Sequence, residues 1–398
     1  MAVCNDEISL QKPRWLDPDT ITGLSNINYE IGNINRISDV SYEYFFTKYM
    51  RANRPCIISS SVTMNWKSRL EWVSTDGQPD FEFLERNFGS AVVPVSDCDS
   101  REYNSQCKED MLFKDYLSYW QALKHNTKDQ SRCLYLKDWH FQRLYPNYQA
   151  YETPKYFSSD WLNEYCETQK DDFKFVYMGP KGTWTPLHAD VYGSYSWSAN
   201  ICGRKRWLLF PPGQEECLKD DKKQLPYFLT DSDLLKLSVV YLDVIQEPEE
   251  IIFVPSGWYH QVINMEDTIS INHNWFNSCN ILYIWHCLYK TALDVENELS
   301  DCKLADDWED QCQLVLRTLH GINYEDFLQI LKFILEERFN HLTSHRKEDN
   351  WLQLYDVMSV KSVCSKIIQC KLSEKLHCIV NDLQHSVTEF LSEIEGEC

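Results

Sequence analysis

The sequence predicts a mainly β fold with α-helical additions, built around a double-sheet jelly roll. Between Tyr135 and Phe276, short apolar segments follow one another and are bounded by Gly, Pro and Asp, a pattern typical of two-sheet β barrels. After Phe276 the apolar residues recur at helical spacing, beginning with Ile281, Trp285 and Leu288, which indicates a helical tail. Before Tyr135, helical and strand-like patterns alternate, so we expect α/β elements there.

These patterns divide the 398 residues into three parts. We expect an N-terminal α/β part (1–130) that packs on the barrel, a jelly-roll core (131–276) and a helical C-terminal region (277–398). The apolar content of 43% suffices for a substantial core. The sequence leaves two roles open for the helical region: homodimer formation, or packing on the barrel of the same chain, which would leave a monomer.

Within these parts we expect individual elements in the following order. They are an aromatic-striped helix within 28–50, a buried strand at 53–58, a helix carrying Trp66 and Trp72, a helix at 81–88, a strand at 91–95 with an edge-tolerant Pro94, a helix at 111–123, a strand at 173–178, and an inserted loop with some helix at 214–236.

One motif and one distant histidine indicate a metal site. His188 and Asp190 are two residues apart, so on an extended strand both side chains leave the same face. His260 follows an apolar strand and a Pro-Ser-Gly turn. Two imidazoles and one carboxylate on one side of a metal leave its other side open, as in non-haem Fe(II) oxygenases. The alternative to a metal site is that the His-x-Asp spacing arises by chance and that His260 is a hydrogen-bonded core histidine. We interpret a further histidine, His273, as such a core residue.

A lysine lies on a strand between these two halves. In residues 203–212, strand alternation places Lys205, Trp207 and Leu209 on one face, which we expect to be the inside of the barrel. A buried ammonium without an anion is very costly. A dicarboxylate cosubstrate would supply that anion.

At this point the sequence resembles a known family, the JmjC-domain 2-oxoglutarate oxygenases, whose core is a cupin-like jelly roll. The resemblance is carried by blocks in the same order as in the family: residues 134–138 (LYLKD), 185–190 (TPLHAD), 203–212 (GRKRWLLFPP), 253–260 (FVPSGWYH) and 268–276 (TISINHNWF).

Residue by residue, the resemblance implies a site for Fe(II) and for the cosubstrates 2-oxoglutarate and O2. The implied iron ligands, which are also the implied catalytic residues, are His188, Asp190 and His260. The implied 2-oxoglutarate contacts are Tyr135, Thr185 and Lys205. Two positions depart from the family pattern: Ser198 stands where Asn is common, and Asn272 stands where Thr is common.

The whole arrangement is most similar to the JmjC lysyl hydroxylases, which implies a protein substrate. The implied reaction is hydroxylation at C4 of a lysine in the eukaryotic translation termination release factor, which promotes termination. Arginine or asparagine is the competing target. A histone N-methyl-lysine demethylase would use the same chemistry, but Cys-rich companion modules are absent. A catalytically silent cupin scaffold would tolerate loss of Lys205, so its presence argues for an enzyme.

Charge and cysteine usage bound the partners and the compartment. The net charge of −21 disfavours direct binding to nucleic acid; it serves solubility and could also attract a basic substrate. The 16 cysteines are scattered without a C-x-x-C pair, which favours a reducing compartment. Residues 1–17 lack the pattern of a secretory leader, and no apolar run is long enough to cross a membrane. These features leave the cytosol and the nucleus open, and the resemblance to the lysyl hydroxylases implies a cytoplasmic protein.

Overall fold

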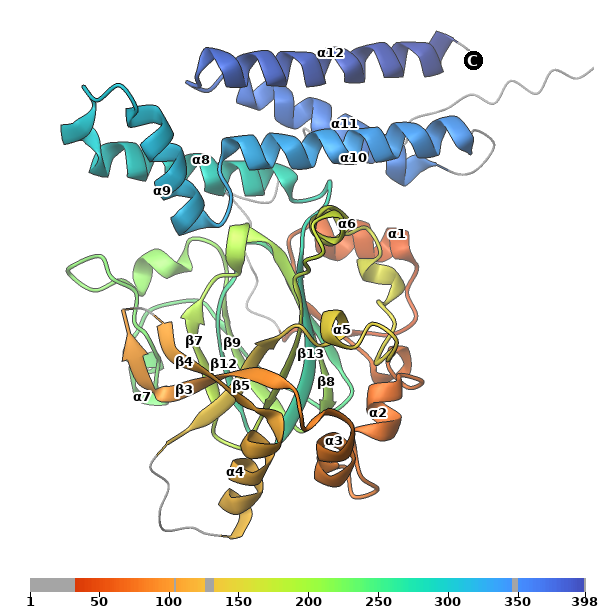
Figure 1. Cartoon of the computed structure of the whole chain (residues 1–398), viewed down its shortest axis with the longest axis vertical. Helices are drawn as coiled ribbons and strands as arrows, with labels where there is room; N and C mark the ends of the chain where they lie inside the picture. The colour runs from red at the N-terminus through yellow and green to blue at the C-terminus, as the bar shows by residue number, and fades with distance from the viewer. Residues whose placement is uncertain (1–32, 104, 126–131, 346–349, 397–398) are drawn as a thin grey trace, which may run out of the picture. The chain divides into compact units, whose positions relative to one another are not determined.

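The computed structural model describes residues 33–103, 105–125, 132–345 and 350–396 (Figure 1). The described residues divide into two compact units, one before and one after the boundary between Trp275 and Phe276. The first unit contains the β-sheets, and the described part of the second is helical. The expected mainly β core with α-helical additions is confirmed. The expectation for residues 1–17 lies outside the described residues, and the division at 130 and 276 stays a proposal.

Two β-sheets make up the barrel of the first unit. In spatial order, the strands of the larger sheet are β1 (Asn35–Ile37), β2 (Cys56–Ile58), β11 (Ile251–Val254), β8 (Tyr195–Cys202), β13 (Thr268–Trp275), β6 (Lys174–Gly179), β5 (Leu134–Trp139), β3 (Val92–Glu102) and β4 (Ser105–Leu112). Those of the smaller sheet are β10 (Leu242–Gln246), β9 (Lys205–Phe210), β12 (Tyr259–Asn264) and β7 (Trp184–His188). Apart from the parallel pair β1–β2, these neighbours run antiparallel.

Alternation along β13 separates a polar inner face from an aromatic outer face. Ser270 reaches Lys205 on β9 of the smaller sheet, so Ser270 and its strand neighbours of the same parity face the barrel interior. On the opposite face, Trp275 packs edge-on against Phe157 with ring centroids 5.0 Å apart. The strand is therefore buried on both sides, yet its inner side is polar, as a binding site requires.

Short helices cover the outer side of the larger sheet. They are α1 (Tyr42–Phe45) continued by a π-helical turn (Phe46–Met50), α2 (Lys67–Glu71), α3 (Phe81–Phe88), α4 (Phe113–His125), α5 (Phe141–Leu144) and α6 (Trp161–Thr168), with 3-10 turns at Ser60–Val62 and Lys155–Phe157. The segment between β9 and β10 contains a 3-10 turn (Gln214–Cys217) and α7 (Asp231–Leu234), and its Leu218 and Leu234 share an apolar cluster with Leu208 of the smaller sheet. Another 3-10 turn (Val191–Gly193) follows β7, and one (Ser300–Cys302) belongs to the second unit. The expected aromatic stripe is present: Phe45 lies 5.3 Å from Phe253 of β11, centroid to centroid.

Three details differ from the expectations for the N-terminal part. Trp66 and Trp72 flank α2 as its caps instead of lying within it. β3 pairs with both β4 and β5, so it is no edge strand; Pro94 is tolerated because the β5 pairing begins at Val95. Strand β4 was not expected, because its residues are mostly exposed and polar and carry no apolar alternation.

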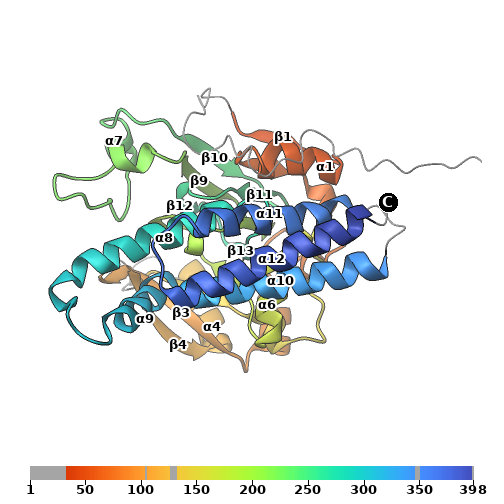
Figure 2. The ribbon, with the colours of Figure 1, turned by 90° about the horizontal axis from the view of Figure 1, so that it is seen from above.

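The second unit contains five helices in its described residues: α8 (Ile281–Glu298), α9 (Trp308–His320), α10 (Tyr324–Ser344), α11 (Trp351–Ile367) and α12 (Glu374–Gly396). Figure 2 shows α10, α11 and α12 side by side, and the rings of Phe339 and Phe390 stack with centroids 3.8 Å apart between α10 and α12. On α9, Leu316 is buried, whereas Leu314 and Leu319 are exposed. No helix among the described residues is long and apolar enough to cross a membrane.

Candidate metal and cosubstrate site

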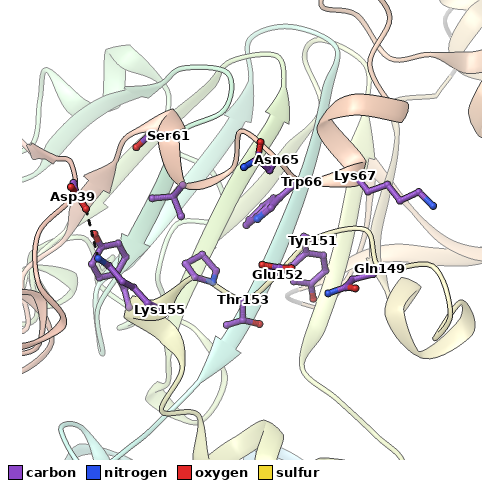
Figure 3. A pocket seen from close by; sticks show the side chains of 13 residues that line it. Asp39, Ser61, Asn65, Trp66, Lys67, Gln149, Tyr151, Glu152, Thr153 and Lys155 are labelled. Carbon is purple, nitrogen blue, oxygen red and sulfur yellow. Dashed lines mark ion pairs between the residues drawn. The ribbon is translucent and has the colours of Figure 1, made fainter.

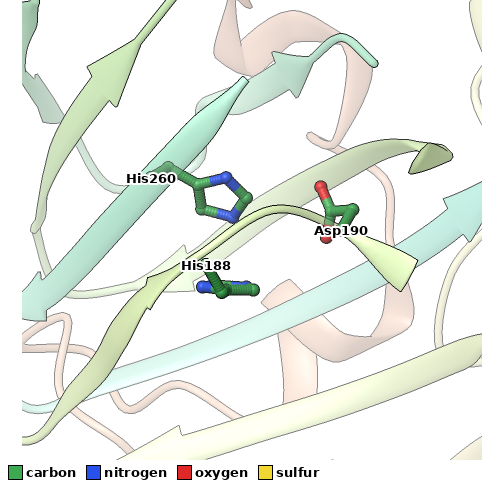
Figure 4. A group of neighbouring side chains, drawn as sticks. All are labelled: His188, Asp190 and His260. Atoms are coloured by element: carbon green, nitrogen blue, oxygen red, sulfur yellow. The ribbon is translucent and has the colours of Figure 1, made fainter. Parts of the chain in front are cut away.

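His188, Asp190 and His260 come together inside the barrel (Figure 4). We call these residues the metal triad. One ligand atom from each lies within 4.8 Å of the other two, and the two imidazole centroids are 4.3 Å apart. His188 ends β7, and its Cα partner across the sheet is His260 on β12. The pairing of two strands therefore places both histidines beside each other, although they are 72 residues apart in sequence.

Backbone carbonyls fix the orientation of both imidazole rings. His188 Nδ1 lies 2.8 Å from the carbonyl oxygen of Pro186, and His260 Nδ1 lies 2.9 Å from that of Trp258. A carbonyl can only accept, so each Nδ1 carries the proton and each Nε2 keeps a free lone pair for a metal. Burial, followed by the neighbouring His260, lowers the pKa of His188 to about 4. His188 is therefore neutral at physiological pH, the form that binds metals.

The third member, Asp190, follows β7 and caps the turn Val191–Gly193. Ser196 Oγ donates to its Oδ2 at 2.6 Å, and Asn274 Nδ2 donates to its Oδ1 at 2.9 Å. These bonds come from two different strands, β8 and β13, and fix the carboxylate plane. Hydrogen bonds of this kind orient metal-binding carboxylates. Our sequence reasoning missed Ser196 and Asn274.

A β-bulge brings Thr185 to the same side as His188. Thr185 pairs with Val262 while His188 pairs with His260, and the register shifts between the two pairs. Directly paired residues lie on the same face of a sheet, so the bulge compensates for the odd spacing of three between Thr185 and His188. Thr185 thus shares the inner face of the sheet with His188.

Lys205 on β9 points into the barrel and is 2% exposed. Its Nζ donates to Ser270 Oγ at 2.7 Å and to Tyr135 OH at 3.4 Å. We call Tyr135, Lys205, Ser270 and Asn272 the Lys205 cluster, because Asn272 Nδ2 also donates to Ser270 Oγ at 3.2 Å. The partners of this buried ammonium that are described here are neutral. Burial lowers the pKa of Lys205 to about 7, which is the signature of a cation that needs an anion.

The neighbouring arginines are engaged elsewhere. Arg204 forms an exposed ion pair with Glu266, and Arg206 pairs with Asp243. Both guanidinium groups are therefore already paired with carboxylates of the chain, which leaves Lys205 as the cation for an anionic ligand.

The close packing around Tyr135 requires a glycine on β6. A Cβ at Gly179 would lie 2.5 Å from Tyr135 Cδ2, which no side chain could accept without movement. Gly179 therefore lets the Tyr135 ring reach Lys205.

The two positions that depart from the family pattern face each other. Asn272 and Ser198 are direct Cα partners on β13 and β8, and both lie on the inner face. The larger amide stands opposite the smaller hydroxyl, and the buried Ser198 Oγ has no hydrogen-bond partner among the residues that the structure describes. A buried hydroxyl of this kind is expected to bond to a ligand or water. The two substituted positions therefore still place one amide and one hydroxyl on the inner face, next to the Lys205 cluster.

A cavity of about 750 Å³ lies away from the metal triad (Figure 3). Its walls include Trp66 and Tyr151. Tyr151 OH lies 2.5 Å from His273 Nε2, and His273 is on the outer face of β13. The cavity is therefore separated from the metal triad by the larger sheet. His273 is a hydrogen-bonded core histidine, as expected.

The chemistry of the donor set fits an iron site. Two neutral imidazoles and one carboxylate form the facial arrangement that leaves metal positions open for other ligands. The uncompensated Lys205 ammonium lies on the same inner face and fits a dicarboxylate.

Comparison with known proteins supports this class. Residues 175–275 match the family model described as JmjC domain, hydroxylase. The chain is 50% identical over 320 residues to the 2-oxoglutarate and iron-dependent oxygenase JMJD4 of Gallus gallus, covering 78% of this chain and 75% of that protein. It is 43% identical over 340 residues to the Homo sapiens protein of that name, covering 83% and 82%. It is also 42% identical over 337 residues to the arginine-specific demethylase JMJ20 of Arabidopsis thaliana, covering 78% and 71%.

The jelly roll, the metal triad and the matched domain together define a JmjC-type oxygenase. Within that class, the chain belongs to the JMJD4 family of 2-oxoglutarate and iron-dependent oxygenases. It is therefore a dioxygenase whose cofactor is Fe(II) and whose cosubstrates are 2-oxoglutarate and O2.

Proposed function

We propose that this oxygenase hydroxylates a lysine side chain of a protein at C4. The observation that carries the proposal is the complete inner face, with the metal triad and the Lys205 cluster together, in a chain similar to JMJD4 over most of its length. The substrate we propose is the eukaryotic translation termination release factor, at a lysine in the segment that reads the stop codon. Hydroxylation there would promote termination, and the proposed compartment is the cytoplasm.

We assign the site residues in the same proposal. His188, Asp190 and His260 hold Fe(II), and Lys205 holds the distal carboxylate of 2-oxoglutarate with Thr185 and Tyr135 beside it. Iron with bound 2-oxoglutarate supplies the activation of O2. The chain's own residues orient these groups: Ser196 and Asn274 fix the Asp190 carboxylate.

The experiment is to incubate the purified enzyme with iron, ascorbate, 2-oxoglutarate and the release factor, and to locate added oxygen by peptide mass spectrometry. We expect one oxygen on a lysine with the wild type and none with Asp190→Ala. A release factor with that lysine replaced by arginine is the matched control. If no lysine gains oxygen, or if Asp190→Ala gives the same product, the proposal is wrong.

A second candidate is removal of a methyl group from arginine, favoured by the 42% identity to a protein named arginine-specific demethylase. Both reactions need the same iron site, because the site does not choose which carbon-hydrogen bond is presented. Mass separates them: hydroxylation adds an oxygen, whereas demethylation removes a methyl group. Methylated arginine peptides offered in parallel would show the second activity directly.

The binding of 2-oxoglutarate should weaken as the pH rises above about 7. Burial lowers the pKa of Lys205 to about 7 in the free enzyme, and a bound carboxylate favours the ammonium form. Below that pKa, Lys205 already carries its positive charge. Above it, Lys205 must take up a proton whenever 2-oxoglutarate binds, so the affinity falls by up to about tenfold per pH unit. Calorimetric titration at a series of pH values measures this, and Lys205→Arg, which stays charged throughout, should lose the Lys205 contribution. An identical pH profile for both proteins would contradict the assignment.

A further inference from the structure

A bulge on β5 carries two charged residues next to the site. The register between β5 and β6 shifts between Leu136 and Trp139, and Asp138 within this stretch has a φ of 60°. Aspartate tolerates the left-handed region better than most residues, and bulges redirect side chains beside active sites. The bulge therefore sets the directions of the Lys137 and Asp138 side chains. Neither residue has a role in the metal site or in the binding of 2-oxoglutarate proposed above.

A half-buried tyrosine on β6, Tyr177, links the Asp138 carboxylate to the Lys205 cluster. Tyr177 OH donates to Asp138 Oδ1 at 2.6 Å. The Tyr177 ring packs edge-on against Tyr135 at 5.9 Å and lies 5.9 Å from Lys205 Nζ. Burial raises the pKa of Tyr177, and the charges of Asp138 and Asp190 add to this effect. The Tyr177 hydroxyl therefore stays protonated and donates its hydrogen bond to the Asp138 carboxylate.

Within the described part of the chain, the second oxygen of Asp138 contacts one exchangeable partner, Lys108. Lys108 Nζ of β4 lies 2.6 Å from Asp138 Oδ2, and the two side chains are 46% and 37% exposed. Although burial raises it, the pKa of Asp138 is lowered on balance by Lys108 and by the Tyr177 hydrogen bond, so the carboxylate is ionised. An ion pair this exposed contributes little to stability. Another ammonium could replace Lys108 at little cost.

Lys137 provides the opposite charge on the inner side. It is 8% exposed, and its Nζ donates to Gln106 Oε1 at 2.6 Å. Gln106 in turn donates from Nε2 to the carbonyl oxygen of Trp184 at 3.2 Å, on the strand β7 that ends at His188. An incoming cation would be repelled by Lys137 near the metal triad and attracted by Asp138.

We propose that Asp138 is the specificity-determining residue for a primary ammonium on the substrate, and that Lys108 holds its place until the substrate arrives. This inference rests on the proposed function and names the group that recognises the lysine. Tyr177 orients the carboxylate, and the substrate ammonium takes the position of Lys108 Nζ. Because Lys137 keeps the cationic end away from the metal triad, a carbon within the lysine side chain is presented for oxidation in place of a carbon attached to nitrogen.

The test compares two peptides and three proteins. The peptides carry the stop-codon-reading sequence of the release factor, one with lysine and one with Nε-acetyl-lysine at the target position. The proteins are the wild type, Asp138→Asn and Lys108→Met. A charged hydrogen bond contributes roughly 1.5 to 3 kcal/mol. We therefore expect Asp138→Asn to raise the KM for the lysine peptide at least about tenfold and to leave the acetyl-lysine peptide nearly unchanged, while Lys108→Met lowers the KM for the lysine peptide or leaves it unchanged.

Iron content, 2-oxoglutarate affinity and melting temperature should be the same in the three proteins, which excludes a purely structural effect. An unchanged preference for lysine over acetyl-lysine in Asp138→Asn, or a raised KM in Lys108→Met, would overturn the inference. If the wild type oxidises neither peptide, the proposed function fails, but calorimetric binding of the two unreacted peptides to the wild type and to Asp138→Asn still decides whether Asp138 recognises the ammonium.

Discussion

Replacing His188 with alanine should reduce the affinity for Fe(II) by at least about a hundredfold, since even hydrogen-bond partners of metal ligands contribute 10- to 100-fold. In the folded chain, His188 Nε2 has its lone pair free because Nδ1 donates to Pro186. Without this imidazole, one of the three donor atoms within 4.8 Å of one another is lost. Iron content after anaerobic purification, and equilibrium dialysis with Fe(II), measure the effect.

The matched control for this change is His286→Ala, which removes an exposed histidine from α8. It should retain one iron per chain, as should the wild type. His188→Ala should also keep the far-UV circular dichroism of the wild type, because the residue ends a strand and is not part of the apolar core. Equal iron uptake by His188→Ala and the wild type would refute the assignment of the metal triad.

The metal triad could be predicted because its signals are local. The spacing of His188 and Asp190 suggested a shared face, and the apolar strand before His260 placed that histidine in a second strand. The physical route differs in one respect: Asp190 is not in the strand but caps the turn that follows it, and Tyr192 within that turn has a φ of 61°. Convergence therefore depends on a turn as well as on strand alternation.

The hydrogen bonds that orient the site could not be predicted in the same way. Ser196 and Asn274 meet Asp190 only because β8 and β13 pair in one particular register, and a single sequence does not contain that register. A weaker signal was present: polar residues recur at every second position in 196–200 and in 270–274, which indicates a polar inner face. The bulge that aligns Thr185 with His188 has no comparable sequence signal.

The fold followed from apolar patterns wherever elements are buried on at least one side. β2 is buried throughout and was expected, whereas β4 is largely exposed and was missed. That strand is also the one that supplies Gln106 and Lys108 to the site. Lys108 is 46% exposed, and an exposed polar strand has no apolar alternation from which it could be predicted.

Replacing Lys205 with methionine should raise the concentration of 2-oxoglutarate needed for half-maximal binding at least about tenfold, since a hydrogen bond to a charged group contributes roughly 1.5 to 3 kcal/mol. Methionine has a similar length but no charge and no donor. The Nζ that it removes lies among Ser270 and Tyr135, so a distal carboxylate would lose its cation. Direct binding of 2-oxoglutarate by calorimetry, with iron content measured alongside, separates this loss from loss of the metal.

Two further measurements make the result specific. Arg204→Met removes an exposed cation that pairs with Glu266, and it should leave 2-oxoglutarate binding unchanged. Without the cosubstrate, Lys205→Met should melt no lower than the wild type, because burying an ammonium among neutral partners is unfavourable and the substitution removes that cost. If Lys205→Met binds 2-oxoglutarate as tightly as the wild type does, another group binds the distal carboxylate. The buried ammonium of Lys205 would then bind a different anion.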